Sequence, residues 1–153
     1  MRDAIPKKTI SPDIIASIFR RYKINSKVIM SFNSFSEETK AYVLEGVALA
    51  SDEKPCILSF VNLNHWCLIT NERLIWTNYQ EFNILHYETI ETVDINKENL
   101  LRLGASFKRQ NQEINIKTES GKNFIVNIGE AGGSVFALLS VLGWAVAKKK
   151  HWL

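Results

Sequence analysis

From Ser51 onward, the helical spacing of apolar residues gives way to short runs that are rich in β-branched and aromatic residues and are separated by turn residues. A succession of such runs is typical of strands joined by tight turns, so this feature constrains the fold more than any other. The runs that we expect to form strands are residues 56–62, 65–70, 73–79, 82–87, 90–95, 100–108, 113–118 and 123–128.

The clearest pair of strands lies between residues 113 and 128. Apolar residues occupy every second position of both runs, and Ser120-Gly121 lies between them. Strict alternation places the apolar side chains on one face, and a glycine suits the tight turn. The sequence therefore predicts a hairpin with one buried face.

A helix is predicted over residues 134–147, although Gly143 lowers its helix propensity. Residues 134–147 contain no charged residue, so this helix is apolar nearly all round. A helix that lies on a single sheet normally shows a polar outer face. The run is shorter than the about 20 apolar residues of a membrane span. We expect its second side to be covered by the N-terminal helices, by another copy of the chain or by a bilayer surface.

The first fifty residues predict two helices with a short strand, 27–32, between them. Ser11, Pro12 and Asp13 have the residue types that start a helix. Ser34 or Ser36 caps the second helix, which continues to about Ala50. The apolar stripe of the first helix consists of Ile14, Ile15, Ile18, Phe19 and Tyr22.

Composition narrows the functional classes. A chain of 153 residues that is 46 % hydrophobic suits one compact domain. A net charge of +3 is too small to predict a nucleic-acid partner. Only two cysteines occur, Cys56 and Cys67, and residues 1–8 contain no apolar export segment, so we expect buried thiols and a cytoplasmic location.

Two segments carry a resemblance to a known family. Residues 65–76 (HWCLITNERLIW) and 85–95 (LHYETIETVDI) resemble the bacterial PH-like and GRAM-like domains of the YokE-like PH type, over roughly residues 55–147. The matching positions are Leu68, Thr70, Arg73, Leu74, Ile75, Leu85, Tyr87, Ile90, Val93 and Ile95. The resemblance implies an α+β fold, with a PH-like antiparallel β-barrel closed by a C-terminal α-helix over residues 51–153. Two N-terminal helices form an extension, 1–50, packed on the barrel.

The first segment also has a physical interpretation. Asn71-Glu72 suits a two-residue reversal between Thr70 and Arg73, because asparagine tolerates a left-handed backbone. We expect Arg73 to be a structural partner of a carboxylate or a carbonyl at this turn, with ligand contact as the alternative.

Candidate chemical sites are weak. His65 and Cys67 share a strand face and Cys56 could approach them, but a zinc site needs four ligands and no second close pair exists. Gly129 and Gly132-Gly133 precede a helix, as in a phosphate cradle, yet no Lys-Ser or Lys-Thr follows. We therefore expect no catalytic residues, no metal and no cofactor. Residues 62–64 contain no basic residue, which argues against inositol phosphate recognition at the usual PH loop.

The C-terminal tail carries the one suggestive functional feature. Cations favour a helix C-terminus, but lysines with a tryptophan also suit an anionic lipid surface. The candidate lipid or partner contacts are Lys148, Lys149, Lys150 and Trp152, and the candidate oligomer face is Phe136, Leu139, Leu142 and Trp144. The expected function is a non-enzymatic PH-like binding or scaffold module that acts through protein–protein contacts or self-association. The alternative is a peripheral membrane module that uses the basic tail.

Overall fold

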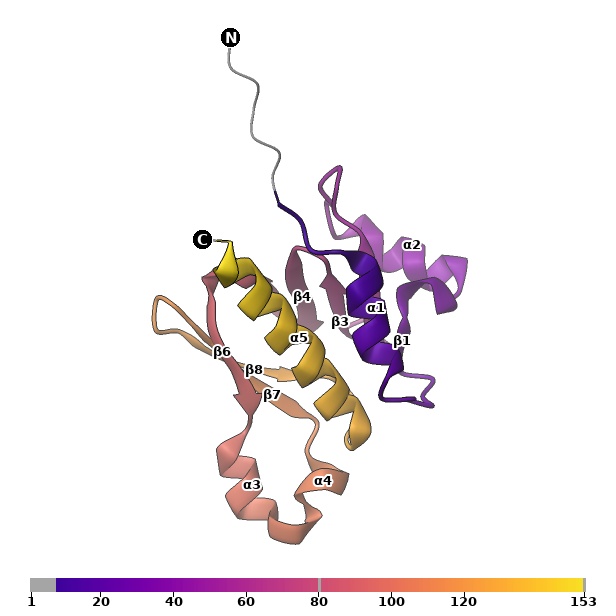
Figure 1. Cartoon of the computed structure of the whole chain (residues 1–153). Coiled ribbons are helices and arrows are strands. Elements are labelled where there is room, and N and C mark those ends of the chain that lie inside the picture. Colours follow the sequence, from indigo (N-terminus) through magenta and orange to yellow (C-terminus); the bar gives the residue numbers. More distant parts are fainter. Residues whose placement is uncertain (1–7, 80, 153) are drawn as a thin grey trace.

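Two antiparallel sheets and a long C-terminal helix make up the fold in the computed structural model, which describes residues 8–79 and 81–152 (Figure 1). The first sheet has the order β1-β2-β3-β4-β5 and the second has the order β6-β7-β8. The strands are β1 (Ile29–Ser31), β2 (Pro55–Asn62), β3 (His65–Thr70), β4 (Arg73–Asn78), β5 (Glu81–His86), β6 (Ile90–Ile95), β7 (Glu113–Thr118) and β8 (Asn123–Asn127).

The helices lie before, between and after the strands. They are α1 (Pro12–Arg20), α2 (Glu37–Glu45), α3 (Lys97–Leu103), α4 (Phe107–Gln110) and α5 (Gly133–His151), with 3-10 turns η1 (Phe32–Ser34), η2 (Tyr87–Thr89) and η3 (Gly104–Ser106). Ser36 caps α2 by accepting a hydrogen bond from the Thr39 N–H. Across residues 8–79 and 81–152, no helix combines the length and the apolar character needed to cross a bilayer.

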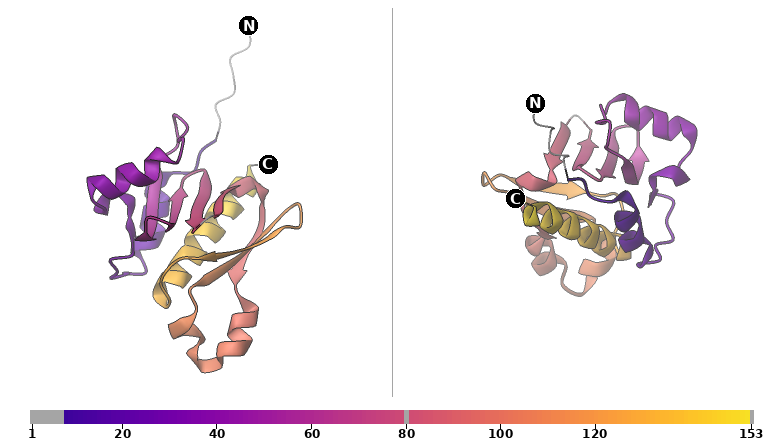
Figure 2. Two further views of the ribbon diagram at one scale, coloured as in Figure 1. Left: turned by 180° about the vertical axis from the view of Figure 1, so that it is seen from behind. Right: turned by 45° about the horizontal axis from the view of Figure 1, so that its top comes forward.

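The first sheet packs against a hydrophobic core on each of its faces. On its inner face, Ile57, Ile69, Leu74 and Leu85 stand opposite one another in register and pack in the larger core with α1, α5 and the second sheet. On its outer face lies α2 (Figure 2), and a smaller core there contains residues of α2 and η1. This outer core consists of Phe32, Val43, Val47, Leu58, Trp66, Leu68 and Ile75.

The second side of the apolar helix α5 is covered by α1. The two helices lie side by side (Figure 2). Ile15, Ile18 and Phe19 of α1 are buried in the core that contains α5, and the Tyr22 hydroxyl shares a hydrogen bond with Ser140. The N-terminal helix is therefore one of the expected covers of α5. Ile14, also predicted on the buried stripe, is 43 % exposed.

Several predictions of local structure are confirmed. β7 and β8 form the expected hairpin, with Ile114 opposite Val126, and the Asn71-Glu72 reversal joins β3 to β4, although Asn71 does not adopt a left-handed backbone. Two predicted elements are wrong. Residues 100–108 were expected as a strand but form the end of α3, η3 and the start of α4. The helix expected to end at Ala147 continues to His151, so the lysines of the tail are helical. The two sheets do not close into a barrel.

Candidate binding surface

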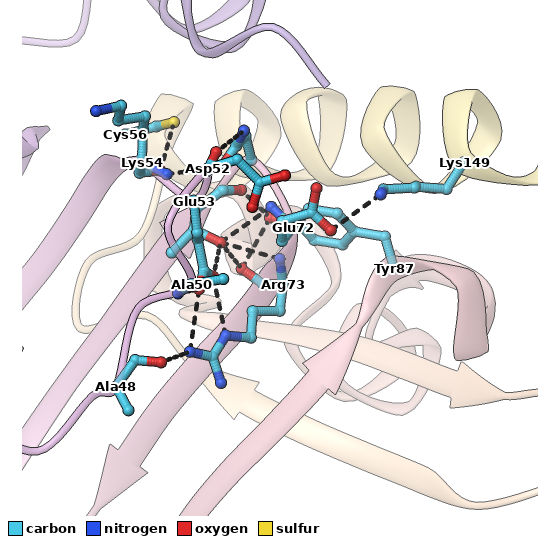
Figure 3. Close-up of polar contacts among 12 residues, drawn as sticks. Ala48, Ala50, Asp52, Glu53, Lys54, Cys56, Glu72, Arg73, Tyr87 and Lys149 are labelled. Carbon is cyan, nitrogen blue, oxygen red and sulfur yellow. Dashed lines mark hydrogen bonds and ion pairs between the residues drawn. The ribbon is translucent and has the colours of Figure 1, made fainter. Parts of the chain in front are cut away.

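A polar network surrounds the turn between β3 and β4 (Figure 3). The Glu53 carboxylate accepts hydrogen bonds from Arg73 Nε at 2.8 Å, from Arg73 Nη2 at 3.1 Å and from the Thr70 hydroxyl at 2.6 Å. Arg73 Nη2 also donates to the Ala48 carbonyl at 2.7 Å. Arg73 is thus a structural partner of a carboxylate and of a carbonyl, as expected.

Burial and hydrogen bonding shift the pKa of Glu53 in opposite directions. Burial raises the pKa of Glu53, but the hydrogen bonds from Arg73 and Thr70 outweigh it and hold the pKa below its ordinary value. The Tyr87 hydroxyl donates to the Thr70 carbonyl at 2.7 Å, and its burial raises its pKa well above the ordinary value. Each of these side chains fixes the backbone of the turn, so the network is structural.

The predicted contact residue Lys149 belongs to the same region. Its ammonium donates to Glu72 Oε2 at 3.0 Å and to the Lys8 carbonyl at 3.3 Å, and the residue is only 5 % exposed (Figure 3). The prediction of Lys149 as a surface contact is therefore wrong. Its position in α5 continues the inward face of Leu142 and Val146, so the side chain enters the protein and ties α5 to the β3–β4 turn.

The remaining tail residues are engaged within the chain. Lys150 forms an ion pair with Glu119 at 2.5 Å and donates to the Glu91 carbonyl at 3.4 Å. The Lys148 ammonium lies 5.7 Å from the centroid of the Trp152 ring. These contacts link the end of α5 to the second sheet, which leaves Lys148 as the tail lysine without an acidic partner among the described residues.

The predicted oligomer face is divided between the core and the surface. Leu142 is 2 % exposed and packs inside the chain, so its inclusion in an outward face is wrong. Leu139 and Trp144 are partly buried against the same core, and Phe136 is also partly buried. The four residues do not form one free apolar surface.

The residues considered for metal or anion binding have structural surroundings. His65 Nε2 lies 2.9 Å from the Asn127 carbonyl, and burial raises the pKa of the Cys56 and Cys67 thiols to about 12. No group of three His, Cys, Asp or Glu side chains is placed to hold a metal within residues 8–79 and 81–152. At the start of α5, the Ser134 hydroxyl donates to Glu130 Oε2 at 2.8 Å, so a carboxylate lies close to this helix terminus.

The free edge of β5 is the least satisfied part of the first sheet. β5 pairs with β4 along one edge, with Phe82 opposite Thr77 and Ile84 opposite Ile75, and no other described strand pairs with it. Phe82 and Ile84 lie on the outer face and are 49 % and 41 % exposed. An exposed apolar edge strand presents backbone donors and acceptors together with side chains that favour burial.

A groove of about 510 Å³ lies beside this edge, between α2 and the outer face of β3–β5. Its position is fixed by the Tyr42 hydroxyl, which donates to the Leu63 carbonyl at 2.8 Å, and by an edge-to-face contact of Trp66 with Phe82. The residues that line it are Tyr42, Glu45, Gly46, Leu63, Asn64, Trp66, Thr77 and Phe82. We call this hollow the α2 groove.

A second hollow, of about 490 Å³, lies between the other side of β5 and the β7–β8 hairpin. Ile84 and Leu85 line it from β5, and Thr118 and Phe124 line it from the hairpin. We call it the seam, because it separates the two sheets where a closed barrel would be continuous. The free edge of β5 therefore borders both hollows, the α2 groove on the outer face of the first sheet and the seam toward the second sheet.

Sequence reasoning identified the strand at residues 82–87 but not its exposure. Phe82 and Ile84 are two residues apart, which predicts a shared face, yet the sequence does not say whether a neighbouring strand covers them. Comparison of the chain with family models, with curated proteins and with solved structures gives no match.

Proposed function

We propose that the protein is a non-enzymatic binding module whose free β5 edge receives an extended segment of a partner protein. The observation that carries this proposal is the exposure of Phe82 and Ile84 on an unpaired strand between two hollows. A strand added to β5 would satisfy the backbone groups of that edge and bury both side chains.

The periodicity of a strand suits this geometry. Successive side chains of an added strand point to opposite faces, so alternate residues would approach the α2 groove and the residues between them would approach the seam. Each hollow contains apolar side chains, with Trp66 and Phe82 in the α2 groove and Leu85 and Phe124 in the seam. The seam is also lined by the charged residues Glu88, Glu119 and Lys122. We therefore expect a partner segment with apolar residues on both faces.

Charge gives the segment one further property. Glu45 is the charged residue that lines the α2 groove, and α2 as a whole carries Glu37, Glu38 and Glu45 against Lys40. A lysine or arginine of the partner, placed near Glu45, would complement this face. An acidic segment would be disfavoured.

The proposed relationship to PH-like domains has partial structural support. A four-strand meander, β2–β5, is followed by a three-strand meander, β6–β8, and by α5, which is the element order that the resemblance implies. β1, the N-terminal helices and the helices α3 and α4 between β6 and β7 are additional to that order. Domains with this architecture commonly serve as scaffolds, and the site rather than the fold determines what each of them binds.

The proposal is tested by panning a displayed library of linear peptides against the full chain. Selected peptides should carry apolar residues at alternate positions together with a basic residue. The double variant F82S/I84S should weaken binding of a synthetic selected peptide by about tenfold or more, because two apolar contacts are removed. The matched control is Ile125→Ser, since Ile125 is 56 % exposed on the edge strand of the other sheet.

Three outcomes would contradict the proposal. The first is binding that F82S/I84S leaves unchanged, and the second is no enrichment of peptides at all. The third is a wild-type dimer in light scattering that F82S/I84S converts to a monomer, which would identify a second copy as the occupant of β5.

The alternative of lipid binding through the basic tail has less structural support. Lys149 is buried against Glu72 and Lys150 is paired with Glu119, so the tail offers Lys148 and Trp152 to a membrane. A single cation adds only about 1 kcal/mol near an anionic surface.

A further inference from the structure

Residues 97–110 form a helical excursion that projects from the second sheet between β6 and β7 (Figure 1). It consists of α3, η3 and α4. α3 contains three leucines, yet none of its residues is buried. Leu101 is 86 % exposed, which is the highest value among the large apolar side chains of the described residues, and Leu100 is 40 % exposed.

The orientation of α3 is fixed by polar contacts on its inner side. Asn99 Nδ2 donates to Asn111 Oδ1 at 3.0 Å and to Glu113 Oε1 at 2.7 Å. Asn96 caps the helix through the Asn99 N–H and also donates to Glu113 Oε1, at 2.9 Å. A polar side chain thus faces the protein while Leu101 faces solvent, the reverse of an ordinary surface helix.

The excursion also carries the net charge of the chain. Its basic residues are Lys97, Arg102, Lys108 and Arg109, and its one acidic residue is Glu98. The rest of the chain has fifteen basic and fifteen acidic residues. Arg102, Lys108 and Arg109 are exposed and have no acidic partner among the described residues, and Lys97 lies 3.8 Å from the exposed Asp94.

We propose that this excursion is a contact surface for anionic lipid bilayers, with Leu101 entering the interface and the surrounding bases lying near the headgroups. Transfer of an exposed leucine from water into the membrane interface is favourable, and each nearby lysine or arginine adds attraction to an anionic leaflet. The same charges would attract nucleic acid, but nucleobases stack on exposed aromatic side chains. The one aromatic residue of the excursion, Phe107, is buried. The proposal does not depend on partner binding at β5.

This surface is distinct from the basic tail. The Lys108 carbonyl lies beside Gly132, at the N-terminal end of α5, whereas Lys148 and Trp152 are at its C-terminal end. Figure 1 shows the excursion and the C-terminus on opposite sides of the molecule. A helix of 19 residues is about 28 Å long, so variants can separate the two surfaces.

Co-sedimentation of the full chain with vesicles tests the proposal. We expect binding to vesicles of phosphatidylcholine and phosphatidylserine in equal parts, weakening with salt, and much weaker binding to phosphatidylcholine alone. Leu101→Ser should weaken binding about tenfold. R102E/K108E should weaken it about thirtyfold or more, because two attractive charges become repulsive.

The controls are Leu63→Ser and Lys148→Glu, which should bind as the wild type does. Leu63 is 57 % exposed on a turn without basic residues, and Lys148 belongs to the tail. A second readout is a solvent-sensitive dye on L101C, which should shift to shorter emission wavelength with the anionic vesicles, while the dye on L63C should not. Cys56 and Cys67 are buried, so the introduced thiol is the one that reacts.

The proposal is overturned if the wild type does not bind the anionic vesicles, or if L101S and R102E/K108E bind as the wild type does. Loss of binding in K148E alone would assign the lipid contact to the tail instead. Each variant is compared by circular dichroism, and an exposed position such as Leu101 should leave the fold unchanged.

Discussion

The Lys149 ammonium and the Glu72 carboxylate lie 3.0 Å apart, with side chains 6 % and 4 % exposed, and they join the end of α5 to the turn between β3 and β4. These residues are 77 positions apart in the chain. Through this contact, the helix that covers the inner core is fixed to the first sheet at a site that also contains the Glu53–Arg73 pair.

Removal of the Lys149 charge should destabilise the fold strongly. Lys149→Met removes the ammonium that lies 3.0 Å from the buried Glu72 carboxylate, and breaking a buried ion pair costs about 3 kcal/mol or more. The free energy of unfolding, measured with urea, checks this prediction. Lys148→Met is the matched control and should change stability by less than about 0.5 kcal/mol. Equal stability of the two variants would contradict a structural role for Lys149.

The Glu53 carboxyl should make stability depend on pH in the acid range. Its pKa is lower in the folded state than its ordinary value of 4.5, so on acidification the unfolded chain takes up the proton first. The stabilisation is therefore complete above about pH 4.5 and is lost as the pH falls through the lower folded pKa. Urea unfolding across this range should show a steeper fall for the wild type than for Glu53→Gln. Parallel curves of stability against pH for the two proteins would contradict a lowered pKa of Glu53 in the folded state.

Both native thiols should be nearly inert. With the pKa of Cys56 and Cys67 raised to about 12, only about one thiol in ten thousand is ionised at about pH 8, and both side chains are buried. Reaction with a disulfide reagent should therefore follow unfolding, and two thiols should react promptly in denaturant. Fast reaction of either thiol in the native protein would contradict their placement in the core.

Substitution by alanine at two glycines should change the free energy of unfolding in opposite directions. Gly129 has φ +84°, and an added Cβ would overlap the Val61 Cγ2 methyl, so Gly129→Ala should lower the free energy of unfolding by about 2 kcal/mol. Gly143 lies within α5, and nothing is within 4 Å of its added Cβ, so Gly143→Ala should raise it by about 0.5–1 kcal/mol. Thermal unfolding of both variants checks the two signs.

Sequence patterns predicted the elements whose signals are local. The alternation in residues 113–128 identifies a hairpin because one face is buried and the other is not. The same reasoning gave a strand for residues 100–108, where the helix is instead set by its ends. Asn96 caps α3, and Gly104 adopts a left-handed φ of +55° that ends it. These two residues were the signal that pattern reasoning overlooked.

The functional surfaces depend on relationships that a sequence does not contain. Lys149 was predicted at the surface because its partner Glu72 is distant in the chain. Phe82 and Ile84 were recognised as strand residues, but their exposure follows from which strands fail to meet at the seam. Leu101 is exposed because Asn99 takes the inward position of α3, a choice decided by the acceptors Asn111 and Glu113.

Hydrogen–deuterium exchange of the full chain, with and without a selected peptide, tests the central claim most directly. If a partner segment adds to the free edge of the first sheet, amide exchange should slow in residues 81–86, and F82S/I84S should abolish that protection. Protection confined to other parts of the chain, with exchange in β5 unchanged, would contradict the assignment of β5 as the binding edge.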